Sequence, residues 1–135
     1  MFHPWRALRD LPHITVVWAR LEHVSALTDG ISIIWLDSRL LQVEKRCSLT
    51  HELIHIERSH THRQTPAVEH QVRAETARRL IPFEELLRHK RWALSIDELA
   101  DCLWVTPRVL CDRIDNLSPK ERAIFLAAYC EDGAD

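Results

Sequence analysis

His51-Glu52-Leu53-Ile54-His55 is the stretch of sequence from which the fold and the site can be worked out. On an α-helix, residues i and i+4 lie on one face, so His51 and His55 can both donate a nitrogen to one tetrahedral Zn²⁺. Glu52 lies roughly 100° round the helix from His51. There its carboxylate reaches a metal-bound water rather than the metal, which is the position of a general base. The competing interpretation is a surface helix with two solvated imidazoles, because the chain has nine histidines.

The composition is that of a folded domain with little net charge. The chain has 135 residues, 46% of them hydrophobic, with five tryptophans, which suffices for one domain or one domain with a small appendage. A net charge of −2 gives no overall attraction to nucleic acid or to an anionic membrane. With only two glycines, helices and short turns are favoured over a barrel or a sandwich.

The cysteines and the first residues predict a cytoplasmic protein. The N-terminus shows no signal-peptide pattern, and the longest apolar run, residues 123–130, is too short to span a membrane. Widely spaced cysteines without a C-x-x-C pair favour reduced thiols. They are Cys47, Cys102, Cys111 and Cys130.

Two segments rich in β-branched and aromatic residues, 14–19 and 31–36, predict strands. We expect their tryptophans, Trp18 and Trp35, to be core residues. Asp29-Gly30 is a hairpin signal, although the connection is too long for a tight turn unless another strand lies within 21–28. The sequence therefore predicts a small antiparallel sheet.

Helical patterns fill the rest of the chain. Ser38 is a candidate cap for a helix whose apolar period continues to Ile56, with the two motif histidines on a different face. Thr65-Pro66 opens a helix over about 67–81, and a short helix is predicted over 83–87. Capping signals at Ser95, Thr106 and Ser118 open three more, over about 96–103, 107–115 and 119–130.

These elements predict an α+β fold in two parts. Residues 1–92 would form a zinc-metallopeptidase-like domain, in which the small antiparallel sheet packs on zincin-type helices that carry the H-E-x-x-H motif. Residues 93–135 would form a helical, helix-turn-helix-like segment packed on that domain, since the helices over 96–103 and 107–115 have the length and spacing of that motif.

A catalytic zinc needs a third protein ligand and an open position for water. The metzincin continuation is excluded, because Arg58 and Thr61 stand where it requires Gly and His. His60 and His62 could ligate if the helix breaks before them. A carboxylate on the following helix is the other solution, and its candidates are Glu69 and Glu75. Six residues apart, these two face different directions, so at most one fits.

The segment Arg46–His55, followed by a helix ending in Ala77-Arg78-Arg79-Leu80-Ile81-Pro82, resembles the ImmA/IrrE family of metallopeptidases, and most closely the short versions in actinobacterial phages and mobile elements. In that family the third ligand is a Glu thirteen residues before the closing proline, and counting back from Pro82 selects Glu69. The chain departs from the family pattern in two places. Val72-Arg73 replaces a pair that is often small and polar, and Glu75 a residue that is usually apolar.

The resemblance implies a zinc-dependent endopeptidase whose substrate is a partner transcriptional repressor. His51, His55 and Glu69 would hold Zn²⁺, and Glu52 would activate the water. A donor for the developing oxyanion is not identified by the sequence. The candidates are His60, His62, His70 and Tyr129.

Two other functions compete with the peptidase. In the first, residues 95–117 form a helix-turn-helix that binds DNA or a repressor protein, with zinc structural or absent. Its recognition helix would offer Arg108 and Arg113 beside Asp112 and Asp115, which is less positive charge than DNA-reading helices usually carry. In the second, a structural zinc merely joins two helices, and Glu52 would then have no role.

Overall fold

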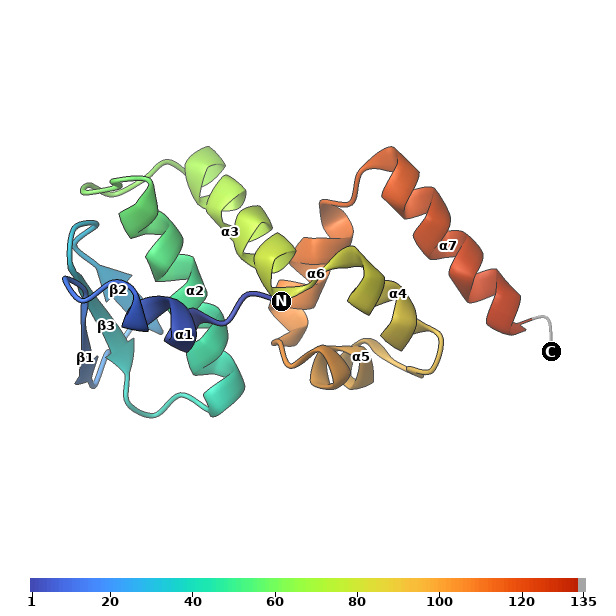
Figure 1. The fold of residues 1–135 in the computed structure, drawn as a ribbon, viewed down its shortest axis with the longest axis horizontal. Helices are drawn as coiled ribbons and strands as arrows, with labels where there is room; N and C mark the ends of the chain where they lie inside the picture. Colours follow the sequence, from blue (N-terminus) through green and yellow to red (C-terminus); the bar gives the residue numbers. More distant parts are fainter. Residues whose placement is uncertain (134–135) are drawn as a thin grey trace.

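The structure is a computed structural model that describes the backbone of residues 1–133 and the side chains of residues 1–128. Within this range the chain is α+β, with seven helices and three strands. In chain order these are α1 (Pro4–Arg9), β1 (Thr15–Ala19), β2 (Ala26–Thr28), β3 (Ile33–Asp37), α2 (Gln42–Glu57), α3 (Pro66–Leu80), α4 (Phe83–Lys90), α5 (Ile96–Leu103), α6 (Pro107–Asp115) and α7 (Pro119–Gly133). Figure 1 shows the sheet at one end of the molecule, α2 and α3 beside it, and α7 at the opposite end.

The sheet has the order β1-β3-β2, with β3 in the middle. β2 runs antiparallel to β3 and joins it through the Asp29-Gly30 turn, as the hairpin signal indicated. β1 runs parallel to β3, with Thr15 opposite Ile33. The prediction of an antiparallel sheet is therefore wrong for this pairing, and the sheet is mixed. The extra strand within 21–28 adds a second reversal of the chain, and two reversals make β1 and β3 parallel.

The strand tryptophans are less buried than expected. Trp18 is 48% exposed on the edge strand β1, and Trp35 is half-buried. The indole of Trp18 stacks on Trp5 with ring centroids 6.0 Å apart, and Nζ of Lys45 lies 4.9 Å from the Trp18 ring centroid. The core prediction for Trp18 is thus wrong, because its ring lies at the surface between an aromatic and a cationic partner.

Helix α2 packs its apolar side on the sheet, as predicted. Leu49 and Leu53 form one core cluster with Ile34 and Leu36 of β3. Ser38 does not cap this helix. Its N–H donates to the carbonyl of Ala19, which keeps Ser38 in the turn that follows the sheet.

The helix begins instead after Leu41, whose N–H donates to the Glu44 carboxylate at 2.8 Å. In this way, a carboxylate in the first turn accepts a hydrogen bond from a backbone N–H that has no partner within the helix. Glu44 thus replaces Ser38 as the residue that fixes the start of α2.

The later helices begin where their capping signals predicted. The side-chain oxygens of Thr65, Ser95 and Thr106 each accept a hydrogen bond from the N–H three residues on, at the starts of α3, α5 and α6. Helices α5 and α6 have the predicted bounds, whereas α4 and α7 extend three residues beyond theirs. None of the helices in the described part of the chain is long and apolar enough to cross a membrane.

A second core cluster joins α2 and α3 to the C-terminal helices. Leu80 at the end of α3 packs in it with Leu86 of α4, Leu99 of α5 and Leu110 of α6. The cluster contains residues on both sides of position 92, and α6 also packs along α3. The C-terminal helices are therefore held against the helices that carry the candidate site.

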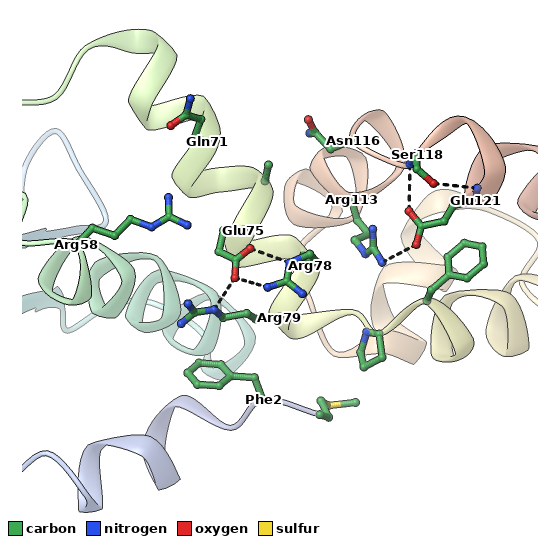
Figure 2. A pocket seen from close by; sticks show the side chains of 14 residues that line it. Phe2, Arg58, Gln71, Glu75, Arg78, Arg79, Arg113, Asn116, Ser118 and Glu121 are labelled. Carbon is green, nitrogen blue, oxygen red and sulfur yellow. Dashed lines mark hydrogen bonds and ion pairs between the residues drawn. The ribbon is translucent and has the colours of Figure 1, made fainter.

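Glu75 lies in an ion-pair cluster that joins α3 to the end of α2, and Figure 2 shows the part of it that involves Arg78 and Arg79. Its carboxylate accepts hydrogen bonds from Arg78 at 2.7 Å and Arg79 at 2.8 Å, and Arg79 also donates to Glu57 at 2.7 Å. The hydrogen bond from Arg78, helped by that from Arg79, lowers the pKa of Glu75 to about 2 against the opposing effect of burial. Glu75 is therefore ionised and engaged by arginines near neutral pH.

Replacing Glu75 with Gln is expected to lower the free energy of unfolding at pH 7 by about 1 kcal/mol, the upper value for pairs with an exposed partner. Folding lowers the pKa of Glu75 from 4.5 to about 2, so its contribution is present above pH 4.5 and is lost as the pH falls toward 2. Urea unfolding at pH 7 and pH 3 measures the difference, with the exposed Glu84→Gln as control. An equal effect of Glu75→Gln at both pH values would contradict the assignment.

Candidate metal centre

Three donor atoms from two helices converge on one point. His51 and His55 lie on one side of α2, and Glu69 lies in the first turn of α3. The two histidine Nε2 atoms are 3.2 Å apart. The Glu69 carboxylate places Oε2 3.2 Å from Nε2 of His51, and Oε1 3.0 Å from Nε2 of His55. The group can therefore bind a metal ion.

The spacing of these donors fits a tetrahedral ion. With bonds of about 2.0–2.1 Å, neighbouring ligand atoms around tetrahedral Zn²⁺ are about 3.4 Å apart. The three distances of 3.0 to 3.2 Å are within a few tenths of an ångström of this value. Three protein donors leave the fourth corner of the tetrahedron for a ligand from outside the chain.

Burial keeps both imidazoles neutral near pH 7. The His51 and His55 side chains are 22% and 8% exposed. Loss of hydration lowers the pKa of each histidine below 6.5, and the charge of His55 lowers that of His51 further, while Glu69 opposes both shifts. A neutral imidazole keeps the nitrogen lone pair that a metal ion requires.

Glu52 lies beside the three donors without belonging to them. It is 8% exposed and lines the same cleft. Burial, and after it the negative charge of Glu69, raises the pKa of Glu52 to about 7. Its carboxylate thus lies next to the metal group on α2, where its place in the motif predicted it.

The ring of His60 contacts the ring of His55 on the side away from the metal group. The Nδ1 atoms of the two residues are 2.9 Å apart, and the N–H of His60 donates to the carbonyl of His55. If a metal ion takes the lone pair of His55 Nε2, the proton is on Nδ1, which can then donate to His60 and hold the orientation of the ring. His60 is therefore not the third ligand but a support for one.

Gly30 leaves room for the backbone of His60 to pack against the β2–β3 turn. The chain turns after α2 through Ser59, which has the left-handed φ of 56°, and then passes over Gly30, which has φ 75°. A Cβ at Gly30 would lie 2.2 Å from the carbonyl oxygen of His60 and 2.6 Å from its carbonyl carbon. The β2–β3 turn thus needs a glycine because the loop that positions His55 lies against it.

The metal group lies in a cleft of about 1150 Å³. One wall is β2 with the residues just before it, and the floor is the face of α2 that carries Ser48, His51 and His55. The loop over residues 60–64 closes one end. The other side consists of α3, with Glu69 and Arg73, and of the first turns of α6.

The structure separates the predicted candidates. Glu69 lies in the metal group, whereas Glu75 pairs with the arginines drawn in Figure 2 and is not among the residues that line the cleft. The choice between them agrees with the motif count. His62 lines the cleft, whereas His70 is exposed and outside its lining. The side chain of Tyr129 lies outside the described residues.

Two cleft residues were missed by sequence reasoning, Arg73 and Arg108. Arg73 follows Glu69 by four residues, so the helical period could have placed it on the cleft face of α3. No local signal identifies Arg108, because its position depends on the packing of α6 against α3.

Comparisons of the chain with models of protein families, with curated proteins and with solved structures found no match. The function of this site therefore has to be inferred from its own residues and geometry.

Metal content tests the centre directly. We expect about one bound divalent ion per chain by elemental analysis of purified protein, a loss of binding in His51→Ala, and binding weakened roughly tenfold to a hundredfold in Glu69→Gln. Glu75→Gln is the matched control, since it makes the same change on the same helix outside the cleft. Unchanged metal content in Glu69→Gln, or no uptake of added Zn²⁺ by the wild type, would exclude this ligand set.

The support from Gly30 gives a separate prediction. Gly30→Ala should lower the free energy of unfolding by about 2 kcal/mol and weaken metal binding, because the new Cβ collides with the His60 backbone at a left-handed φ. Ser59→Gly, which relieves a left-handed residue in the same loop, serves as control and should retain metal affinity. Calorimetric titration with metal measures the affinity of both variants. Normal metal affinity in Gly30→Ala would show that the loop does not position His55.

Proposed function

We propose that this protein is a zinc-dependent endopeptidase. The observation that carries the proposal is the convergence of His51, His55 and Glu69 at the floor of an open cleft, with the buried Glu52 beside them. A purely structural site would be closed by a fourth protein ligand. Three protein ligands and an adjacent carboxylate that is not one of them are typical of hydrolytic zinc sites.

Two imidazoles and a carboxylate in tetrahedral spacing favour Zn²⁺ over the harder ions, which prefer oxygen ligands. When bound, zinc lowers the pKa of a water and polarises a carbonyl. Glu52 would act as the general base for the attacking water and then as the general acid toward the leaving amine. His60 keeps the ring of His55 oriented throughout.

A peptide is the substrate class that the cleft fits best. β2 is an edge strand and lines the cleft opposite the metal group. Ser25 and Asp29 make backbone hydrogen bonds to β3, so in the antiparallel alternation the backbone groups of Ala26 and Thr28 point away from it. These groups are available to an extended peptide that adds to the sheet.

We further propose that the substrate is a single partner protein, a transcriptional repressor, and that the enzyme works in the cytoplasm. The repressor follows from the resemblance of the motif segments to the ImmA/IrrE family. The free thiols of Cys47, Cys102 and Cys111 support a reducing compartment.

The helix-turn-helix regulator is less well supported. On α6, the expected recognition helix, Arg113 is buried and donates to the carbonyl of Ile81. Arg108 is exposed but lies on the cleft. The two arginines therefore cannot contact DNA phosphates side by side.

Replacement of the general base tests the proposal. Zinc-loaded wild-type protein is expected to cleave unstructured peptides or a repressor encoded beside it, with new chain ends visible by mass spectrometry. Glu52→Gln should keep the metal and lose cleavage by a factor of about 10² to 10⁴, the usual share of a general base. Glu57→Gln, on the same helix but paired with Arg79 outside the cleft, should cleave normally. Cleavage that persists in Glu52→Gln, or zinc-loaded wild type that cleaves neither substrate, would refute the peptidase.

A further inference from the structure

Two arginines on the α3–α6 side of the cleft have no hydrogen-bond or ion-pair partner among the described residues. Neither Arg73 nor Arg108 forms a hydrogen bond or an ion pair with any residue whose side chain the structure describes. The other arginines of these two helices all do. Arg78 and Arg79 pair with Glu75, and Arg113 donates to Ile81 O. On these two helices, the arginines that face the cleft are therefore the ones left with open donors.

The two guanidinium groups belong to one region of the cleft. Asp112, one turn after Arg108 on α6, lines the cleft with them and is within electrostatic range of both. Arg73 also acts electrostatically on His51, and α3 packs along α6, so Arg73 is within electrostatic range of both the metal group and Asp112. Asp112 supplies one negative charge against two positive ones and pairs directly with neither arginine.

We propose that Arg73 and Arg108 bind a carboxylate of the substrate, so that the cleft selects peptides with an acidic group on the α6 side of the metal. The proposal rests on the proposed function in taking the ligand to be a peptide. A guanidinium offers a planar pair of N–H donors that matches a carboxylate, and two of them from different helices fix its position.

Charge balance near the metal supports the same conclusion. A divalent ion would be offset by the Glu69 carboxylate and, when it is ionised, by Glu52. On the α6 side of the cleft, the two charges of Arg73 and Arg108 exceed the single opposite charge of Asp112, so an acidic group is attracted there and a basic one repelled. Selectivity would thus come from the part of the cleft that the C-terminal helices build.

Binding to an inactive variant tests the proposal apart from catalysis. The probe is a series of short fluorescent peptides with C-terminal amides, in which one Glu moves position by position through Ala, Ser and Gly, and a matched series with Gln. Anisotropy with zinc-loaded Glu52→Gln protein at low ionic strength measures the affinity. We expect Glu to bind roughly tenfold tighter than Gln at one or two positions.

The same measurement is made in the Glu52→Gln background with single arginine variants. Arg73→Gln and Arg108→Gln should each remove most of the preference for Glu, and Arg73→Lys should keep part of it, since the charge remains but the planar fork is lost. Arg9→Gln, an equal change of charge at an exposed position of α1 outside the cleft, should leave the preference intact. Melting curves establish that each variant is folded.

Equal binding of the Glu and Gln series at every position, no binding of either, or a preference that survives both Gln variants would overturn the proposal. A second arm with free C-terminal carboxylates distinguishes the sources, because a preference confined to that arm assigns the site to the chain end rather than to a side chain. The proposed peptidase function can fail independently. If the wild-type protein binds acidic peptides through these arginines but does not cleave them, only the proposed catalysis is refuted.

Discussion

Helix α2 packs one side on the sheet and presents another side to the cleft, and the geometry of the site depends on how its side chains are distributed between the two. Leu49 and Leu53 pack on β3, and burial of each stabilises the fold by about 1.5–3 kcal/mol. His51 and His55 lie on the adjoining face. Because the leucines fix the rotation of the helix, they also fix the direction in which the two imidazoles point.

The third donor comes from a different helix, and its position needs separate supports. Thr65 caps α3 one turn before Glu69, and Arg79 near the other end of α3 pairs with Glu57 of α2. Between the two helices the chain turns at Ser59 and lies against Gly30. The sheet turn, the loop and the ion pair thus hold the two helices at the separation that the donor atoms require.

Most of this site could be predicted from the amino-acid sequence because its parts are local. Helical period and capping residues are encoded within a few positions, so the sequence alone locates the ligand face of α2 and the starts of α3, α5 and α6. It does not reveal the parallel pairing of β1 and β3, since that pairing depends on a three-residue strand, β2, that is too short to give a pattern of its own. The core prediction for Trp18 failed because β1 is an edge strand. Trp18 lies opposite the buried Leu36 in register, but no further strand within residues 1–133 lies on its outer side to cover its ring.

The position of α6 could not be predicted from the sequence either, and it changes the role that the C-terminal helices can have. Leu110 and Arg113 anchor α6 in the core and on the end of α3, so the same helix must present its first turn to the cleft. A helix with its arginines divided in this way, one buried and one lining the cleft, presents little positive charge to DNA and forms part of the cleft wall. The low positive charge of this segment agrees with the proposed carboxylate site, because binding one carboxylate requires only the charges that face the cleft.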